Sequence, residues 1–260
     1  MVRRARLDAE LVRRGLARSR EQAAELVHAG RVKVAGATAT KPATAVEPGT
    51  PVLIEADSDD PGYASRGGHK LAGALDALPV PVEGRRVLDA GASTGGFTDV
   101  LLRRGAREVV AVDVGYGQLA WNLRTDPRVT VHDRTNVREL TPEQIGGPVE
   151  LTVADLSFIP LTLVLPALAA CTTEDLLPMV KPQFEVGKEL VGAKGVVRDP
   201  ELRARAIRKV ADRAYELGLG TKGVVKSPLP GPAGNVEFFL WLRCDAPRAD
   251  PDEIAKVVTL

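Results

Sequence analysis

Two lysines and two carboxylates stand out in this chain because of where they fall among its apolar segments. Asp155 and Lys181 each come directly after an apolar, strand-like run, whereas Glu237 interrupts one. Lys70 is expected to open a helix just after the sequence Arg-Gly-Gly-His. A lysine held among carboxylates can hold or release a proton, because the pKa of lysine responds readily to burial and to neighbouring charge. The four residues therefore form a candidate set for moving a proton.

Each of these residues also has an ordinary structural explanation when it is taken singly. Asp155 could cap a helix, Lys181 could be a solvated side chain, and Glu237 could lie on the edge of a sheet. Lysine is scarce in this chain, however, which carries 25 arginines and only 10 lysines. Lysine at two such positions therefore favours a chemical role over simple positive charge.

The elements that must position these residues alternate between strands and helices from about residue 84. A strand pattern at 86–90 leads into a glycine-rich turn at 91–97, and a helix follows at 98–104. This alternation predicts an α/β domain with a mostly parallel sheet covered on both faces. Further strands are predicted at 108–112, 128–131, 150–154 and 176–180. A last strand at 236–242 follows a turn rich in proline and glycine, so we expect an antiparallel pairing with its predecessor.

The glycine-rich turn has three competing interpretations. A phosphate-binding P-loop is excluded because no Gly-Lys-Ser/Thr follows, and Gly91, Gly95 and Gly96 do not reproduce the dinucleotide pattern G-x-G-x-x-G. A loop for S-adenosylmethionine remains, in which Asp89 would meet the methionine ammonium and the glycines would let the backbone approach the ligand. A purely structural tight turn is the alternative.

Two further aspartates follow the next strands. Asp113 ends the segment Val-Val-Ala-Val, where an acid can accept hydrogen bonds from ribose hydroxyls, as in NAD-binding folds. Asp133 follows Val-Thr-Val-His and is a candidate for the adenine amino group. Either could instead be an ordinary aspartate at a loop end. The predicted cofactor-binding residues are Asp89, Gly91, Ser93, Thr94, Gly95, Gly96, Phe97, Asp113 and Asp133.

The amino-terminal segment is strongly basic. Residues 1–41 contain ten arginines and lysines against four acids, a local charge of +6. Such a cluster commonly marks a surface for a polyanion, although a solvated helix face is the alternative.

This basic segment also has the pattern of two short helices followed by a small sheet. Asp8 is placed to cap the first helix and Gly15 to end it, and Ser19 and Gly30 are placed likewise in the second. Alternating residues predict strands at 31–34 and 52–55. The arrangement resembles the RNA-binding fold first seen in small-subunit ribosomal protein four. That resemblance implies RNA contacts from Arg3, Arg4, Arg6, Arg14, Arg18, Arg20, Arg31, Lys33 and Lys41.

The composition excludes several other classes of protein. Over 260 residues, 44% hydrophobic and 27% charged residues are typical of a soluble globular chain. The longest apolar stretch, 158–171, is too short and too interrupted by proline for a membrane span. The first residues contain no apolar signal segment, so a cytoplasmic protein is expected. Two cysteines and three histidines show no zinc-like spacing, so no metal site is expected.

Over essentially its whole length the sequence resembles the TlyA family of ribosomal RNA 2′-O-methyltransferases, also named haemolysins, and most closely the actinobacterial members. The motifs that carry the resemblance lie at 65–71, 88–98, 113–121, 154–158, 180–188, 227–231 and 234–237. The resemblance implies an RNA-binding domain at 1–57, a linker at 58–64, and an FtsJ-like methyltransferase domain at 65–260. That last domain would be a Rossmann-like class I methyltransferase with a mostly parallel seven-stranded sheet.

The resemblance also implies a reaction. The cofactor would be S-adenosylmethionine, and the substrate would be the 2′-hydroxyl of cytidines in 16S and 23S rRNA, within the 30S and 50S subunits. Lys70, Asp155, Lys181 and Glu237 match the catalytic Lys-Asp-Lys-Glu set of the family. Lys181 would handle the hydroxyl proton while the carboxylates orient both ammonium groups. The activity would affect susceptibility to capreomycin- and viomycin-type antibiotics, and we expect a monomer without stable membrane association.

The chain departs from its relatives in the linker. They carry an Arg-x-Trp-type tetrapeptide, whereas this chain reads Pro-Gly-Tyr-Ala at 61–64, and only Tyr63 keeps an aromatic ring there.

The sequence disfavours three rival functions. A secreted pore-former, which the haemolysin name suggests, would need a signal, a spanning segment or a lytic helix. A methyltransferase for small molecules would leave the basic domain without a use. An RNA-binding scaffold without catalysis is hard to reconcile with four filled catalytic positions.

Overall fold

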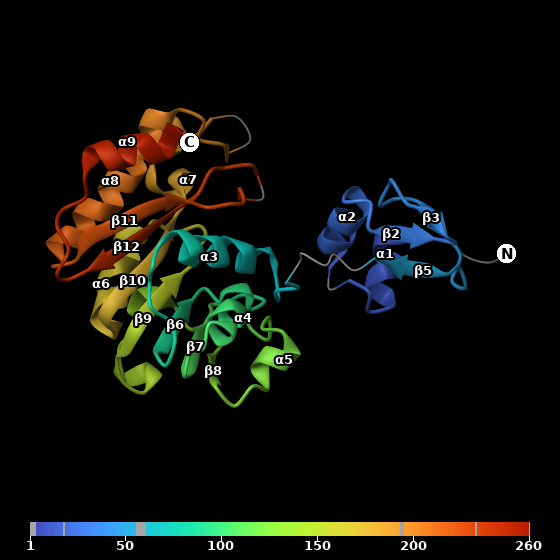
Figure 1. The fold of residues 1–260 in the computed structure, drawn as a ribbon, viewed down its shortest axis with the longest axis horizontal. Helices are drawn as coiled ribbons and strands as arrows, with labels where there is room; N and C mark the ends of the chain where they lie inside the picture. The colour runs from blue at the N-terminus through green and yellow to red at the C-terminus, as the bar shows by residue number, and fades with distance from the viewer. Residues whose placement is uncertain (1–3, 18, 56–60, 193–194, 232, 260) are drawn as a thin grey trace. The chain divides into compact units, whose positions relative to one another are not determined.

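The computed structural model describes residues 4–17, 19–55, 61–192, 195–231 and 233–259. The chain divides into two compact units, Met1–Gly62 and Tyr63–Leu260 (Figure 1). Each unit has a hydrophobic core of its own.

The small unit packs two helices against short strands. A buried cluster that includes Leu7, Leu11, Val27 and Val32 forms its core. The Ser19 hydroxyl accepts a hydrogen bond from the backbone N–H of Gln22, which confirms the predicted cap. Its elements are β1 (Ala5–Arg6), α1 (Leu7–Arg13), α2 (Arg20–His28), β2 (Val32–Val34), β3 (Ala37–Thr38), β4 (Ala45–Val46) and β5 (Val52–Ile54). Strand β2 pairs antiparallel with both β3 and β5, and β1 pairs antiparallel with β4.

The prediction that Asp8 caps the first helix was wrong. Arg6 occupies the N-cap position, and Asp8 lies inside the first turn of α1, only 4% exposed. Its carboxylate is held by the guanidinium groups of Arg6, at 2.8 Å, and Arg20, at 3.1 Å. These contacts lower the pKa of Asp8 well below its usual range, so the residue ties the two helices together as an ion pair.

The large unit is built on one seven-stranded sheet with the order β11-β12-β10-β9-β6-β7-β8. Neighbouring strands are parallel except β12, which is antiparallel to both β10 and β11, as predicted for the last strand. The strands are β6 (Arg86–Ala90), β7 (Glu108–Val112), β8 (Val129–His132), β9 (Val149–Ala154), β10 (Thr172–Val180), β11 (Gly220–Lys226) and β12 (Phe238–Arg243).

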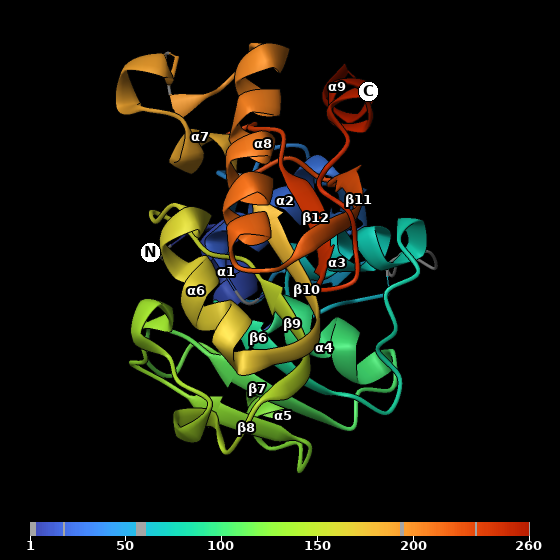
Figure 2. The same ribbon diagram turned by 90° about the vertical axis from the view of Figure 1, so that its left-hand side faces the viewer.

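The helices cover both faces of this sheet (Figures 1 and 2). They are α3 (Arg66–Ala77), α4 (Gly96–Arg103), α5 (Trp121–Arg124), α6 (Leu161–Cys171), α7 (Pro182–Glu185), α8 (Pro200–Glu216) and α9 (Pro251–Thr259). Short 3-10 turns lie at Val137–Glu139, Glu143–Ile145 and Lys188–Leu190. Among the described residues, no helix is both long and apolar enough to cross a membrane.

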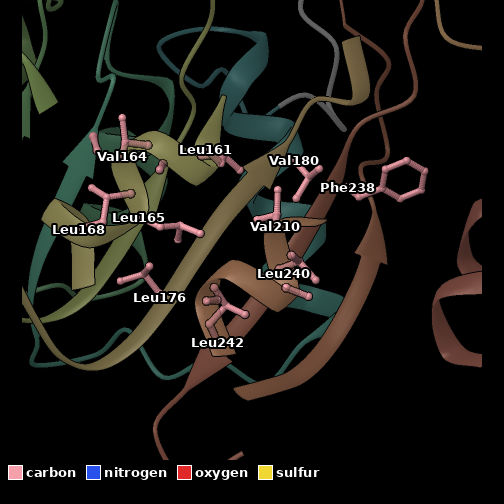
Figure 3. Close-up of a cluster of buried hydrophobic side chains, with 14 of the residues drawn as sticks. Leu161, Val164, Leu165, Leu168, Leu176, Val180, Val210, Phe238, Leu240 and Leu242 are labelled. Atoms are coloured by element: carbon pink, nitrogen blue, oxygen red, sulfur yellow. The ribbon is translucent and has the colours of Figure 1, made fainter. Parts of the chain in front are cut away.

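Alternation along the strands divides the core into two layers. Val87 and Val109 pack with α3 and α4 on one face, whereas Leu88 and Val110 point to the other face. That second layer is filled from α6, α8 and α9, and Figure 3 shows part of it, including Leu165 and Val210. Because both faces are covered, the strand ends are the places left for a site.

Three of the predicted positions that bear on the site differ in the structure. Helix α3 begins at Arg66, so Lys70 lies in its second turn rather than at its start. Strand β10 begins at Thr172, well before the predicted residue 176. Glu237 directly precedes β12 instead of interrupting a strand, and it is 1% exposed.

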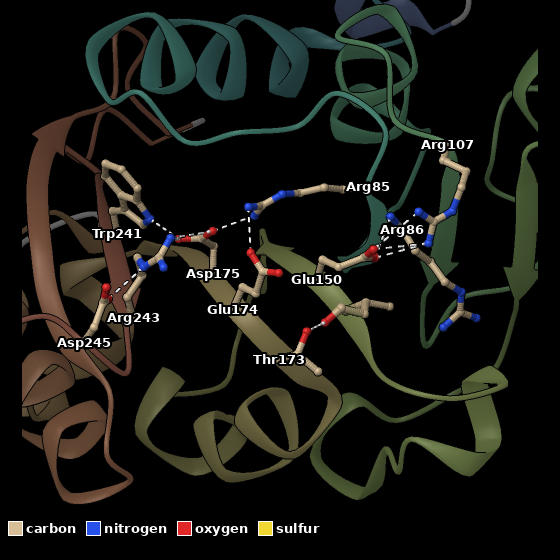
Figure 4. Close-up of polar contacts among 11 residues, drawn as sticks. Arg85, Arg86, Arg107, Glu150, Thr173, Glu174, Asp175, Trp241, Arg243 and Asp245 are labelled. Carbon is tan, nitrogen blue, oxygen red and sulfur yellow. Dashed lines mark hydrogen bonds and ion pairs between the residues drawn. The ribbon is translucent and has the colours of Figure 1, made fainter.

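A buried charge network lies toward the amino ends of the parallel strands (Figure 4). The Asp175 carboxylate has no solvent exposure. It accepts hydrogen bonds from Arg85 Nη1 and from the indole Nε1 of Trp241, both at 2.6 Å. Arg243 Nη1 lies 3.4 Å away. These contacts connect the start of β6, strand β10 and strand β12.

We expect Asp175→Asn to destabilise the large unit by about 3 kcal/mol, because it leaves two arginines facing a neutral group in a desolvated place. Urea unfolding of the full chain measures the change. Glu174→Gln is the matched control, since Glu174 binds the same Arg85 but its side chain is 45% exposed. Its substitution should cost less than about 0.5 kcal/mol. Equal losses in the two variants would contradict the assignment of the network to Asp175.

Candidate active site

The four predicted catalytic residues form two lysine–carboxylate pairs. Lys181 Nζ lies 2.6 Å from Asp155 Oδ1 and donates a hydrogen bond to Ser157 Oγ at 2.8 Å. Lys70 Nζ donates to Glu237 Oε2 at 2.6 Å. Each lysine therefore pairs with one carboxylate. The expectation was that the two carboxylates together orient both ammonium groups.

The pair of Lys181 and Asp155 follows from the pairing of β9 with β10. These strands are parallel, with Ala154 opposite Pro178. Asp155 is the first residue after β9 and Lys181 the first after β10. Both side chains therefore leave the sheet at the same edge.

The pair of Lys70 and Glu237 joins α3 to the start of β12. Both side chains are almost fully buried, at 9% and 1% exposure. The loop before β12 closes tightly on the carboxylate, since a Cβ at Gly231 would lie 2.5 Å from Glu237 Oε1. A buried carboxylate of this kind requires a cationic partner, and Lys70 provides it.

Asp89 is a buried acid with unused hydrogen-bonding capacity. It has no solvent exposure, and its Oδ2 accepts a hydrogen bond from Thr98 Oγ1 at 2.6 Å. Its Oδ1 has no hydrogen-bond partner among the described residues. Burial raises the pKa of Asp89 to about 7, and the negative charges of Asp155 and Asp113 add to the increase.

The glycine-rich turn is required first by packing within the protein. Gly91 has φ 86°, and a Cβ there would lie 2.6 Å from the carbonyl oxygen of Asp155. A Cβ at Gly96 would lie 2.3 Å from Ser65 Oγ and 2.8 Å from the backbone nitrogen of Gly68. The turn can thus bring β6, β9 and α3 together only with glycine at these positions. A tight structural turn and a ligand loop are therefore compatible here.

The other residues predicted on this turn differ in their exposure. Ser93, with φ 48°, and Thr94 are exposed, and Gly95, with φ 96°, is the N-cap of α4. Phe97 is only 3% exposed, and its ring packs 6.0 Å from the ring of Phe239. Phe97 therefore belongs to the core between α4 and the sheet.

Asp113 ties the glycine-rich turn to the end of β7. Its carboxylate accepts hydrogen bonds from the backbone N–H groups of Ser93, at 2.8 Å, and Gly115, at 2.7 Å. Asp133 lies after β8 and accepts a hydrogen bond from Arg124 Nη1 at 2.9 Å, which lowers its pKa. Asp133 thus already has a cationic partner.

Three residues of the site were not among the predicted ones. Ser157 binds Lys181 directly. Phe158 has φ 66° and is 91% exposed, and its ring lies 5.4 Å from that of Phe184. A bulky residue in the left-handed region is costly, and such residues gather at functional sites. Glu185 is buried, and burial raises its pKa to about 6. The Ala-Asp-Leu-Ser-Phe motif at 154–158 was the available signal for the first two.

Tyr63 and Ala64 pack on the large unit. The Tyr63 ring lies 4.9 Å from the guanidinium of Arg103, and a Cβ at Gly68 would lie 2.5 Å from Tyr63 Cβ. The backbone N–H of Ala64 donates to Asp99 Oδ2 at 2.8 Å. Tyr63 and Ala64 are therefore fixed to α3 and α4.

The predicted RNA-binding cations of the small unit are not equivalent. Arg14 donates to Glu10, at 2.6 Å, and to the backbone carbonyls of Thr50, at 2.7 Å, and Pro48, at 2.8 Å, so it is a structural residue. Lys41 is exposed, and its ammonium has no partner in the part of the chain that the structure describes.

The remaining cations lie between these extremes. Arg4 pairs with Glu47, Arg6 and Arg20 pair with Asp8, Arg31 donates to the Glu55 carbonyl, and Lys33 pairs with the Glu55 carboxylate. Arg3 and Arg18 fall outside the described residues.

Comparison with protein families agrees with the two-unit architecture. The model of the FtsJ-like methyltransferase family matches residues 63–244, and the S4 domain model matches residues 5–52. The large unit therefore has the Rossmann-like methyltransferase fold, and the small unit has the fold first seen in ribosomal protein four.

Individual relatives agree as well. The 16S/23S rRNA (cytidine-2′-O)-methyltransferase TlyA of Mycobacterium tuberculosis is 64% identical over 96% of this chain and 93% of its own length. Hemolysin A of Brachyspira hyodysenteriae is 33% identical over 90% of this chain and 98% of its own length. A solved structure from Streptococcus thermophilus, also named as a hemolysin, has a TM-score of 0.79 and 39% identity, covering 100% of this chain and 96% of that one. The chain accordingly belongs to the TlyA family of FtsJ-like methyltransferases.

Proposed function

We propose that this enzyme transfers the methyl group of S-adenosylmethionine to ribose 2′-hydroxyls of ribosomal RNA, with cytidines of 16S and 23S rRNA as targets. The observation that carries the proposal is the Lys181 ammonium fixed by Asp155 and Ser157 at the carboxyl edge of the sheet. The family relationship supports the choice of substrate, because the Mycobacterium tuberculosis relative is named for that reaction.

The buried acid below the glycine-rich turn fits the cofactor. Asp89 Oδ1 is buried and unpartnered among the described residues, so it can accept a hydrogen bond from an ammonium group such as that of the methionine moiety. Asp113 is assigned to the ribose hydroxyls, because it directly follows β7, the strand next to β6, and its carboxylate keeps further lone pairs. When bound, S-adenosylmethionine supplies a methyl group on a sulfonium.

Lys181 is assigned to the proton of the 2′-hydroxyl. A ribose hydroxyl that accepts a methyl group must lose its proton. Asp155 and Ser157 fix the position of Lys181 Nζ, and Lys70 adds a second positive charge that Glu237 balances. A neutral Lys181 would take the proton, whereas a charged Lys181 would stabilise the developing alkoxide while the proton passes to water. The first role predicts that the rate of methyl transfer falls at low pH, and the second role does not.

The small unit is assigned to binding of the RNA backbone. Its exposed cations suit phosphate oxygens, and contacts with about six phosphates would give log affinity a slope of roughly −4 to −5 against log salt. The direct experiment is incubation with labelled S-adenosylmethionine and separate 30S and 50S subunits, followed by mapping of 2′-O-methyl nucleotides. Absence of label from both rRNAs would overturn the proposed function.

Asp89 gives the cofactor affinity a characteristic pH dependence. In the free protein Asp89 is largely protonated below about pH 7, whereas an ammonium ligand favours the carboxylate. Binding in acid must therefore release a proton, so we expect affinity to fall by up to about tenfold per pH unit between pH 7 and pH 5. Calorimetry measures this. Asp89→Asn should bind weakly and without that slope, and Asp76→Asn, at an exposed position on α3, should behave as wild type. An unchanged slope in Asp89→Asn would remove Asp89 from the cofactor site.

Lys181→Arg separates a chemical role from simple positive charge. Arginine keeps the charge, but it cannot release a proton in a protein and its planar fork directs donors differently. We expect methyl transfer in a single turnover to fall by about 10²–10⁴-fold while cofactor affinity is retained. Lys222→Arg is the matched control, because Lys222 lies over the ring of Trp241 and outside the site. Near-normal turnover in Lys181→Arg would exclude Lys181 from proton transfer.

The two extreme cations of the small unit should respond in opposite ways. Lys41→Gln should weaken binding to ribosomal subunits and reduce the salt slope by about one, with no change in thermal stability. Arg14→Gln should instead cost about 2 kcal/mol of stability in the small unit, because it removes three internal hydrogen bonds of a charged group. Filter binding and thermal unfolding measure the two effects. A stability loss in Lys41→Gln would contradict its assignment as a free cation.

A further inference from the structure

Glu185 is a buried carboxylate outside the two catalytic pairs. It is the last residue of α7, the short helix that begins directly after Lys181. It is 4% exposed, and its Oε1 accepts a hydrogen bond from the backbone N–H of Leu161 at 2.6 Å. The other oxygen, Oε2, has no hydrogen-bond partner among the described residues. In the part of the chain that the structure describes, the hydrogen bond from Leu161 is therefore the one that this carboxylate accepts.

Leu161 is the first residue of α6, and it closes the segment that carries the partners of Lys181. Residues 155–160 connect β9 to α6 and include Asp155 and Ser157. No side chain from the segment itself caps α6, since Pro160 occupies the N-cap position. Glu185 supplies the missing acceptor from a different part of the chain, at the helix end where a carboxylate is favoured.

Segments 155–161 and 181–185 are consequently held together at both ends. At one end Lys181 binds Asp155 and Ser157, and at the other end Glu185 binds Leu161. The position of α7 is fixed from a second side as well, because Lys209 Nζ of α8 donates to the Glu185 carbonyl at 2.8 Å. The side chain of Glu185 thus connects α7 to the start of α6.

We propose that Glu185 is a positioning residue for Lys181: its hydrogen bond to the Leu161 N–H sets the spacing of the two segments and thereby keeps Lys181 Nζ on Asp155 and Ser157. The inference rests on the proposed function for the meaning of that geometry. Displacement of a reacting group by about 1 Å can cost about 10²-fold in rate, so a contact four residues away can matter for turnover.

If Glu185 acts through its hydrogen bond, its variants should rank differently in the rate of methyl transfer than if it acts through its charge. Glu185→Gln keeps an oxygen at the same reach and should support the contact without the charge. Glu185→Asp keeps the charge but is one methylene shorter, and Glu185→Ala removes the acceptor. We expect single-turnover methyl transfer to fall about 10- to 100-fold in Glu185→Asp and Glu185→Ala. Glu185→Gln should stay within about threefold of wild type, and S-adenosylmethionine affinity should not change in any of them.

A matched control separates positioning from general loss of stability. Asp199 caps α8 by accepting a hydrogen bond from the Glu201 N–H at 2.9 Å, but it links neither catalytic segment. Asp199→Ala should therefore lose a helix cap, worth about 1 kcal/mol, without loss of turnover. If Glu185→Ala does not fold, the comparison of Glu185→Gln with Glu185→Asp decides the matter alone.

A readout that needs no RNA keeps this proposal distinct from the proposed function. The side-chain nitrogen resonance of Lys181, assigned by its loss in Lys181→Arg, reports the environment of the ammonium. It should move in Glu185→Asp and remain in place in Glu185→Gln. Failure of the wild type to methylate rRNA would overturn the proposed function and leave this comparison intact. A normal rate in Glu185→Asp, or a slow rate in Glu185→Gln, would overturn the positioning role.

Discussion

The parallel pairing of β9 with β10, and of β9 with β6, is the constraint on which the rest of the site depends. Ala154 lies opposite Ala90 on one side and Pro178 on the other, so the three strands reach the same edge in register. Residues that follow these strands are therefore brought close together. A shift of β10 by one residue would turn Lys181 to the other face of the sheet. The backbone hydrogen bonds of the sheet therefore determine where the catalytic residues lie, independently of the contacts that their side chains make.

Buried carboxylates are satisfied differently at the amino ends and at the carboxyl ends of the parallel strands. At the amino edge, Asp175 is satisfied by two arginines and an indole N–H, which is the arrangement expected of a structural group. At the carboxyl edge, Asp89 keeps an unpartnered oxygen among the described residues and a pKa raised to about 7. Incomplete satisfaction costs stability, and it is tolerated where a ligand can complete the set. The Asp89 carboxylate therefore has room for a further hydrogen bond, whereas the Asp175 carboxylate is already satisfied within the protein.

The sequence predicted the parallel architecture and the strands well, because apolar runs and glycine turns carry local information. It also predicted that Asp155 and Lys181 belong together, since both follow strands. It could not assign carboxylates to lysines, because the contact of Lys70 with Glu237 joins residues 167 positions apart. The sequence could not predict the contact of Glu185 with Leu161 either, since a glutamate four residues after a lysine is typical of a solvated helix. Asp8 was misread for a related reason, because its carboxylate binds not only the nearby Arg6 but also Arg20, which belongs to the second helix.

The position of β12 in the sheet determines when the active site can form during synthesis of the chain. This strand lies between β10 and β11 although it comes last in the sheet by chain order. While the protein is being synthesised, β10 therefore presents an open edge until residues 220–243 have emerged, and an unpaired edge is a site for wrong association. Lys70, made early, has no carboxylate until Glu237 arrives with that hairpin. The pairing of β12 with β10 and the formation of the Lys70–Glu237 ion pair therefore occur together. A nascent chain cannot have a complete active site before β12 has joined the sheet.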